Sequence, residues 1–525
     1  MISKIIEIAK RFPSHIAVVD DCLNVTYEEL IGLAKAKAEQ IKKIIGENNQ
    51  TKIVITQRNK KLDAITDTLA CWMLKYGFLN LPVNYPKDRL LSIIDLIHPV
   101  FFITDEKQYF HKNSYTYNSD LAYMIFTSGT TGVPKGVMIG QNNLQAFVNA
   151  LQQVLPTDLN TRMLQYASFS FDASIWEIFA TLSFGGTIIL TPNEVLISDS
   201  LEAFMKKYEV SRALLTPVVA QSIINKFISS LKELIVGGDA FPPKILELWG
   251  QHFRLWNAYG PTEATICVLM HEFKTKQESI VLGKPLQGNN LLIDDIGQMI
   301  ILGNQVGIGY LEKDKICYFN GRYETGDLIK QTEDNNFIFK GRIDSQIKIR
   351  GYRLSLNEVQ LTIQSINGIE SCCVIAVEEH ATTSLYAFYQ GEITEAVLTG
   401  YVSNILPHYM IPARFIKLSE WPLMPSGKIN KNALRESVQT IVSVKSFCTN
   451  EKIEEDFKTI WQNVLGVHDI DLDGNFFQLG GQSFQALQVL QDYVDKFNFD
   501  IDLITFFNKP TLNEQIKEFV EQKGV

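Results

Sequence analysis

Short β-branched runs alternate with helical patterns through the first 340 residues, and this alternation limits the fold more than any other feature. The runs "KIVIT" (52–56), "VFFIT" (100–104) and "GTIIL" (186–190) have the character of buried strands. The segment 26–45 has the apolar spacing of a helix, and Thr26 and Glu29 are placed to form a capping box at its start. Strands that alternate with helices predict an α/β fold with parallel sheet.

Domain organisation follows from length and from shifts in pattern. The chain has 525 residues, more than one hydrophobic core usually supports. We expect a large region over 1–343, a smaller α+β region over 344–438 and, after a patternless linker at 439–450, an all-helical region over 451–525. This last region holds 14 acidic and 6 basic residues, so it carries −8 of the net charge of −9. Its acidity argues against a nucleic-acid partner and favours docking onto basic protein surfaces.

Other bulk properties argue against a membrane or secreted protein. No apolar run has the length of a membrane span. The start, "MISKIIEIAKRF", has lysines within its apolar stretch and no small-residue cleavage site, which predicts an amphipathic helix and not a secretion signal. The seven cysteines show no C-x-x-C spacing, so neither a zinc site nor a disulfide framework is indicated. We therefore expect a cytoplasmic protein in a reducing compartment.

The stretch "YMIFTSGTTGVPKGVMIG" (123–140) places glycines, hydroxyl side chains and one lysine in a loop after an apolar run. Backbone N–H groups, hydroxyls and a cation in one place favour a phosphate chain. A Walker A loop needs Gly-Lys followed by Ser or Thr, whereas Lys135 lies between Pro134 and Gly136. The sequence therefore predicts a phosphate-binding loop of another class, with a plain surface loop as the less favoured alternative.

Further motifs occur in a fixed order along the chain. They are "NVTYEEL" (24–30), "LKYGFLNLPVNYP" (74–86), "FDASIWEIF" (171–179), "NAYGPTEATI" (257–266), "RYETGDL" (322–328), "GRIDSQIKIRGYRL" (341–354), "LPHYMIP" (406–412), "MPSGKINKNAL" (424–434) and "GNFFQLGGQSFQAL" (474–487). The set resembles the ANL adenylate-forming enzymes, and within them the adenylation domains of nonribosomal peptide synthetases, while the last motif resembles a peptidyl carrier protein. Two departures are a shortened strand segment, "IILGNQVGIGYLEKD" (300–314), and Asn430 in place of an aspartate. Neither departure is expected to touch a residue that takes part in the chemistry.

The resemblance implies packed α/β sheets in a large adenylation subdomain, a small mobile α+β subdomain that begins at a hinge, Asp344, and a four-helix carrier domain. It implies that an amino-acid carboxylate attacks the α-phosphate of ATP, giving aminoacyl-AMP and diphosphate. Lys428 would stabilise the charge that develops in this step. The small subdomain would then rotate, bringing Lys348 and Gly351 of "SQIKIRG" beside the adenylate for transfer of the aminoacyl group to the carrier.

The resemblance also assigns the ATP site. Asn257 and Tyr259 would meet adenine, and Asp327 would accept both ribose hydroxyls unless it is only a turn residue. Glu263, a lone carboxylate in "GPTEAT", would bind Mg²⁺, which takes one or two carboxylates besides phosphate oxygens. A solvated loop acid is the alternative for Glu263. The full predicted set is Thr127, Ser128, Gly129, Thr130, Thr131, Lys135, Asn257, Ala258, Tyr259, Gly260, Thr262, Asp327, Phe339, Arg342 and Lys428.

The amino-acid pocket is expected to have one acidic residue in an apolar wall. Asp172 would pair with the α-ammonium group of the substrate, and the alternative is an N-cap of the next helix, which Ser174 could also serve. The set resembles phenylalanine-activating domains of the gramicidin type, departing at Leu214 and Gly237. Leucine-activating domains are the alternative, so the prediction is a large apolar L-amino acid, with phenylalanine ahead of leucine. The predicted wall consists of Asp172, Ala173, Trp176, Leu214, Ile235, Gly237, Ala258, Ile266 and Cys267, closed by Lys428.

Ser483 follows two glycines at the start of a helical pattern, and the carrier resemblance makes it the attachment site of 4′-phosphopantetheine. A plain N-cap serine is the alternative. The implied partners are ATP, an amino acid, a phosphopantetheinyl transferase and, because no condensation or thioesterase motif occurs, a downstream condensation or tailoring enzyme in trans. Two other functions stay open: an acyl- or aryl-CoA ligase, against which Asp172 and the fused carrier count, and a non-catalytic carrier scaffold.

Overall fold

The computed structural model divides the chain into two compact units, Met1–Leu354 and Ser355–Val525. The boundary by contacts falls after the predicted hinge, Asp344, which lies outside the described residues. The structure describes residues 1–20, 23–45, 52–58, 61–83, 85–110, 117, 120–127, 135–192, 196, 198–239, 241, 243–275, 281–312, 315–343, 346–349, 352–379, 382–422, 429–442, 451–467, 470–497, 499, 501, 505–506 and 509–523.

A nine-stranded sheet dominates one side of the first unit. Its centre is parallel and its edges are antiparallel. Helices cover both faces, which explains why its inner strands are almost wholly buried runs of Ile, Val and Leu. The spatial order is β15 (Lys284–Pro285), β14 (Leu269–Phe273), β13 (Arg254–Tyr259), β12 (Glu233–Gly237), β11 (Arg212–Leu215), β9 (Arg162–Gln165), β10 (Thr187–Leu190), β1 (Ile16–Asp20) and β2 (Leu23–Thr26).

The first unit also contains an eight-stranded and a four-stranded sheet, and the runs predicted as strands at 52–56, 100–104 and 186–190 form β3, β5 and β10. An eight-stranded mixed sheet has the order β19 (Lys315–Tyr318), β18 (Gly309–Glu312), β8 (Lys135–Gly140), β7 (Leu121–Thr127), β4 (Gly77–Asn80), β3 (Ile53–Gln57), β5 (Phe101–Thr104) and β6 (Gln108–Phe110). A four-stranded antiparallel sheet has the order β16 (Asn289–Ile293), β17 (Gln298–Gly303), β20 (Arg322–Gln331) and β21 (Phe337–Arg342).

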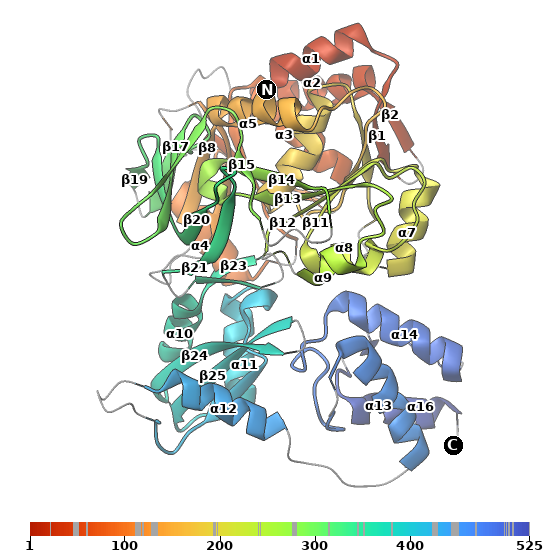
Figure 1. Cartoon of the computed structure of the whole chain (residues 1–525), viewed down its shortest axis with the longest axis vertical. Coiled ribbons are helices and arrows are strands. Elements are labelled where there is room, and N and C mark those ends of the chain that lie inside the picture. Colours follow the sequence, from red (N-terminus) through yellow and green to blue (C-terminus); the bar gives the residue numbers. More distant parts are fainter. Residues whose placement is uncertain are drawn as a thin grey trace. The chain divides into compact units, whose positions relative to one another are not determined.

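The helices of the first unit form three layers around the two large sheets. Figure 1 shows α1, α2, α3 and α5 together at the top of this unit, and α7, α8 and α9 along its lower right side. Helices α1 (Ile2–Arg11), α2 (Tyr27–Ile45), α3 (Lys61–Met73) and α5 (Gln141–Val154) share one core with strands of both sheets. Helices α7 (Ser198–Lys207), α8 (Pro217–Ile223) and α9 (Pro243–Leu248) cover the outer face of the nine-stranded sheet, and α4 (Lys87–Ile97) covers that of the eight-stranded sheet. The predicted α/β fold is confirmed.

Two predicted helix features at the N-terminus are confirmed. Helix α1 is amphipathic, with Ile5 and Ala9 buried. The capping box of α2 is formed, since Thr26 N donates to Glu29 Oε2 at 2.8 Å and Glu29 N donates to Thr26 Oγ1 at 3.2 Å. Across the described ranges, no helix combines the length and apolar character needed to cross a bilayer.

The second unit begins with a small α+β region. A three-stranded sheet pairs β24 (Ile369–Glu379) antiparallel with β25 (Thr382–Gly391), which pairs in parallel with β26 (Arg414–Lys417). Three helices accompany this sheet, α10 (Leu356–Gln364), α11 (Glu395–Ile405) and α12 (Lys431–Val442). A two-stranded ribbon, β22 (Gln346–Ile349) and β23 (Tyr352–Ser355), precedes it. The predicted linker at 439–450 is wrong at its start, because α12, anchored by buried Leu434 and Val438, continues to Val442.

The last region has its own helical core. Helices α13 (Glu451–Leu465), α14 (Ser483–Phe497) and α16 (Leu512–Lys523) pack around Trp461 and Tyr493. Trp461 Nε1 donates to Tyr493 Oη at 2.7 Å, and this hydroxyl donates to Gln515 Oε1 at 2.7 Å. The predicted all-helical region is confirmed. Its predicted fourth helix falls among positions that are partly outside the described residues, so it stays a prediction.

Candidate active site

The ends of the predicted phosphate loop are fixed by a strand pair. Thr127 ends β7 and Lys135 begins β8, and the two residues are opposite each other in the antiparallel register. Ser128, Gly129, Thr130 and Thr131, which form the loop between them, lie outside the described residues. The Lys135 ammonium pairs with Glu312 Oε1 at 2.6 Å, a partner that the sequence reasoning did not predict.

Glu263 is a buried carboxylate. It lies in a short 3-10 helix, Thr262–Ala264, and is 1% exposed, so the alternative of a solvated loop acid is wrong. Its Oε1 accepts a short hydrogen bond from the hydroxyl of Tyr310. The Lys135 ammonium lies 5.1 Å from the centroid of the same tyrosine ring, which places Glu263 and Lys135 around one side chain.

The residues around Glu263 can be compared with what a magnesium site requires. The described residues contain no group of three or more His, Cys, Asp or Glu side chains arranged for a metal. A single buried carboxylate near a phosphate-loop lysine still fits Mg²⁺, because this ion usually takes its other ligands from phosphates and water. The expectation that the shortened segment 300–314 touches no residue with a predicted role is wrong, because Tyr310 contacts Glu263 and Glu312 contacts Lys135.

The predicted ribose residues lie on neighbouring strands of the four-stranded sheet, and Tyr259, on β13 of the nine-stranded sheet, contacts one of them. Asp327 and Arg342 are paired in the register of β20 and β21, and Arg342 Nη1 makes a short contact with Asp327 Oδ1. The hydroxyl of Tyr259 makes a short hydrogen bond to Asp327 Oδ2. Asn257 Nδ2 donates to Val281 O at 2.6 Å, and this bond fixes the orientation of its carboxamide. The partly buried Phe339 packs against the same hydrophobic core as Tyr259.

The predicted amino-acid pocket follows from strand register. Leu214 of β11 is opposite Ile235 of β12, and Gly237 of β12 is opposite Ala258 of β13, so these positions share one face of the sheet. A side chain at Gly237 would press on the neighbouring strand, since its Cβ would lie 2.9 Å from Ala258 O. One buried cluster brings together Trp176, Leu214, Ile235, Ala258, Ile266 and Cys267, with Ala173 packed against it.

Asp172 begins the short helix α6 (Asp172–Ile175), which runs directly into a π-helix at Trp176–Ala180. The N-cap residue is Phe171 and no side chain caps the helix, so the reading of Asp172 as an N-cap is wrong. Burial, together with the charge of Asp172, raises the pKa of Tyr123 well above its ordinary value. Burial, with a smaller contribution from Asp172, raises the pKa of Cys267 to about 12. The negative charge of Asp172 therefore contributes to the raised pKa of Cys267, a residue of the predicted pocket wall.

Glu177 is a buried carboxylate that follows the pocket residue Trp176 directly, and the sequence reasoning missed it. It lies fully buried in the π-helix and accepts hydrogen bonds from the backbone N–H groups of Tyr166 and Ala167 at 3.1–3.2 Å. These bonds fix the loop that leads from β9 to Asp172. Burial raises the pKa of Glu177 to about 8, and burial also lowers the pKa of Lys61 to about 8. A lone carboxylate inside the apolar run "SIWEIF" was the available signal.

The turn that carries Ile266 and Cys267 is strained. Thr265 and Ile266 both have left-handed backbone conformations, with φ of 56° and 73°. Such a conformation costs a β-branched residue about 1–3 kcal/mol. Surrounding contacts hold the turn, among them a hydrogen bond of 2.5 Å from Thr265 Oγ1 to Gln305 O. Gln305 belongs to the same shortened segment as Tyr310 and had no predicted role.

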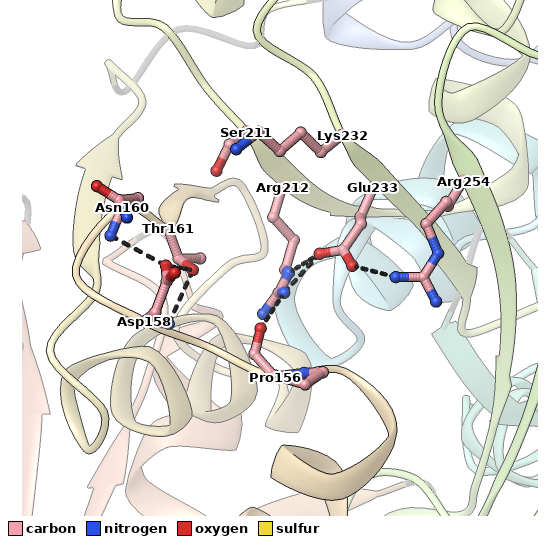
Figure 2. Close-up of a pocket in the computed structure, with 9 residues that line it drawn as sticks. All are labelled: Pro156, Asp158, Asn160, Thr161, Ser211, Arg212, Lys232, Glu233 and Arg254. Atoms are coloured by element: carbon pink, nitrogen blue, oxygen red, sulfur yellow. Dashed lines mark hydrogen bonds and ion pairs between the residues drawn. The ribbon is translucent and has the colours of Figure 1, made fainter.

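A separate polar cluster lies at the amino-terminal ends of the same parallel strands (Figure 2). Figure 2 shows Arg212 and Arg254 on either side of Glu233, with Glu233 oxygens 2.5 Å and 3.1 Å from their nitrogens. Arg212 also donates to Thr157 Oγ1 and Pro156 O, both at 2.7 Å. The cavity of about 250 Å³ beside them is lined by groups that already bind one another. This cluster links the first residues of β11, β12 and β13. The predicted substrate residues lie towards the carboxyl ends of the same strands.

The remaining predicted residues belong to the ribbon and the second unit. Lys428 and Gly351 lie outside the described residues, and Lys348 is described only as part of strand β22. Ser483 is the first residue of α14, the position expected for a phosphopantetheine attachment serine. The roles of these residues stay predictions.

Comparison with known proteins matches both parts of the chain. Residues 110–311 match a family model described as AMP-binding enzyme, and residues 455–519, which include Ser483, match one described as phosphopantetheine attachment site. Tyrocidine synthase 1 of Brevibacillus parabrevis is 32% identical over 98% of this chain, and gramicidin S synthase 1 of Brevibacillus brevis is 30% identical over 98%. The chain spans about half the length of these relatives, 52% of each.

A solved structure has the same fold. Holo-PA1221, described as a nonribosomal peptide synthetase protein containing adenylation and PCP domains, matches with a TM-score of 0.81 and 20% identity over 98% of this chain and 95% of its own. Both family models and the two synthases agree with the resemblance that the motifs indicated, and the solved structure has the fold that this resemblance implies. The chain is therefore an adenylation domain of the nonribosomal peptide synthetase kind fused to a peptidyl carrier domain.

Proposed function

We propose that this chain activates a large apolar L-amino acid with ATP and loads it as a thioester onto its own carrier domain. Phenylalanine is the favoured substrate and leucine the next. The reaction releases diphosphate when aminoacyl-AMP forms and AMP when the aminoacyl group moves to the carrier. The partners that this activity needs are a phosphopantetheinyl transferase and a downstream condensation or tailoring enzyme, and the proposed location is the cytoplasm.

The observation that carries the proposal is the composition of the pocket wall. Among its described residues, Asp172 alone is charged, and most of the others belong to or pack against one buried hydrophobic cluster. A carboxylate at the edge of an apolar wall attracts a cationic group, and the α-ammonium group of an amino acid supplies one. A charged substrate side chain would find no partner along the wall. Small residues at positions 173, 237 and 258 leave room for a large apolar group.

The ATP-site residues have distinct proposed roles. Lys135 would exchange Glu312 for the β- and γ-phosphates, and Asp327 would exchange its contacts with Tyr259 and Arg342 for the ribose hydroxyls. Glu263 would hold Mg²⁺, which would neutralise phosphate charge. Lys428 would supply a cation to the reacting α-phosphate. Positioning and charge neutralisation of this kind account for most of the catalysis of phosphoryl-centre transfers.

The carrier residues serve the second half of the reaction. Ser483, at the start of α14, would hold phosphopantetheine, whose thiol accepts the aminoacyl group. Lys348 and Gly351 would contact the adenylate in this step, after rotation of the small subdomain about Asp344. An acyl- or aryl-CoA ligase would need neither Asp172 nor a fused carrier, so both features argue against that alternative.

Amino-acid-dependent exchange of labelled pyrophosphate into ATP tests the proposal. The wild-type protein should give its highest kcat/KM with phenylalanine or leucine among the twenty amino acids. Neighbouring apolar amino acids should be activated as well, because one methylene group changes selectivity by only about 10- to 200-fold. Highest activity with aspartate, lysine or glycine, or activity restricted to benzoate-type acids, would refute the substrate assignment. No exchange with any acid would refute the activity.

A further inference from the structure

Gln305 is a buried glutamine on the connection between β17 and β18. Its side chain is fully buried and joins two segments that are far apart in the sequence. Its Nε2 donates to Cys267 O at 2.7 Å, and its Oε1 accepts from Asn289 Nδ2 at 2.6 Å. Its backbone oxygen accepts the Thr265 hydroxyl at 2.5 Å. Gln305 therefore binds both ends of the strained turn at Thr265–Cys267.

This turn presents two residues of the amino-acid pocket, Ile266 and Cys267. β-Branched residues disfavour the left-handed region that Thr265 and Ile266 occupy, so the turn needs contacts that fix it. On its other side it packs against Gly260, where a Cβ would lie 2.5 Å from Ile266 O. Gly260 packs against one side of this turn and the hydrogen bonds of Gln305 hold the other, so the turn has little freedom to shift.

The short segment that carries Gln305 also contacts Glu263, the carboxylate predicted to bind Mg²⁺. Gly307 N, two residues after Gln305, donates to Glu263 O at 2.8 Å, and Tyr310 donates to the Glu263 side chain. The segment itself is held in place by Asn143 of α5, whose Nδ2 donates to the backbone oxygens of residues 304 and 306. One rigid connection thus supports a wall of the amino-acid pocket and the Glu263 carboxylate.

We propose that Gln305 is a positioning residue for amino-acid selectivity: its carboxamide holds the left-handed turn that sets the places of Ile266 and Cys267. This inference rests on the proposed function. It predicts that loss of the carboxamide loosens the pocket wall. The discrimination between large apolar amino acids then falls, and the affinity for the best amino acid falls with it.

The test is pyrophosphate exchange with Gln305→Met, which keeps an unbranched side chain of similar length and removes both amide hydrogen bonds. The expected result is a rise of about tenfold in KM for the best amino acid and a change of about tenfold in the phenylalanine-to-leucine ratio of kcat/KM, with KM for ATP within about twofold of wild type. Thr265→Val, which removes only the hydroxyl contact, should act in the same direction and carries the test if Gln305→Met does not fold.

Gln298→Ala is the matched control. Gln298 is another buried glutamine in the first unit, and its Oε1 accepts from Gly326 N at 3.1 Å, next to Asp327. Its loss should raise KM for ATP and leave the ranking of amino acids unchanged. An unchanged amino-acid KM and ranking in Gln305→Met, or an equal rise in both KM values with an unchanged ranking, would overturn the inference alone. Wild-type protein that exchanges with no acid would overturn the proposed function, and the inference with it.

Discussion

Replacement of Asp172 by alanine tests the recognition of the substrate's ammonium group. Asp172 is partly buried and acts on Tyr123 and Cys267, which are both fully enclosed. Removing one partner of a buried charge pair costs about 2–5 kcal/mol, and the partial exposure of Asp172 favours the lower part of this range, about 2–4 kcal/mol. At about 1.4 kcal/mol per tenfold change, Asp172→Ala should lower kcat/KM for phenylalanine by about 30- to 1,000-fold.

The assay compares phenylalanine with phenylpropionate, its analogue without the amino group, in pyrophosphate exchange. In the wild-type protein the analogue offers no ammonium group to Asp172 and should be a poor substrate. In Asp172→Ala the analogue should lose no activity, so the preference for phenylalanine should largely disappear. Asp172→Asn, which keeps the size and removes the charge, is the control for packing. An equal loss for both acids would show that Asp172 supports the structure and does not recognise the ammonium group.

Three other substitutions have defined outcomes. Lys428→Ala should slow adenylation at least about 100-fold and affect thioester formation from supplied aminoacyl-AMP much less; equal damage to both half-reactions in single-turnover assays would contradict the alternation of the small subdomain. Burial raises the pKa of Glu177 from 4.5 to about 8, so its ionisation destabilises the fold as pH rises through this range, by up to about 1.4 kcal/mol per pH unit. Urea unfolding at pH 5 and pH 8 should therefore show the stability of Glu177→Gln improving relative to wild type at the higher pH, and a constant difference would refute this. Glu312→Gln releases Lys135 from an ion pair worth up to about 1 kcal/mol, so KM for ATP should fall by up to about fivefold, and an unchanged or higher KM would show that Glu312 does not compete with phosphate.

The fold and much of the site could be predicted from the sequence because they depend on local patterns. Alternating strand and helix patterns identified β3, β5, β10 and α2, and the family resemblance named the residues of the pocket. In the structure, the parallel register of β11 and β12 brings Leu214, Ile235 and Gly237 together on one face of the sheet. The start of α14 at Ser483 follows from the helical spacing after two glycines.

The residues that hold the site in place could not be predicted in this way. Gln305 contacts Cys267, Tyr310 contacts Glu263 and Glu312 contacts Lys135 through hydrogen bonds or ion pairs between segments distant in the sequence. No local spacing encodes such contacts, since they depend on how β8, β18 and the turn after Glu263 meet. The stretch 300–314 departs from the family pattern, and this hid the residues that support the pocket and the Glu263 carboxylate.

The central claim is that the chain activates an amino acid and loads it onto its own Ser483. Intact-mass measurement of the phosphopantetheinylated protein, incubated with ATP, Mg²⁺ and phenylalanine, tests this claim most directly. The wild-type protein should gain the mass of one phenylalanyl group, and Ser483→Ala should gain neither the arm nor the amino acid while it retains phenylalanine-dependent pyrophosphate exchange. A phosphopantetheinylated wild-type protein that gains no mass with any amino acid, or a Ser483→Ala protein that is still loaded, would contradict it.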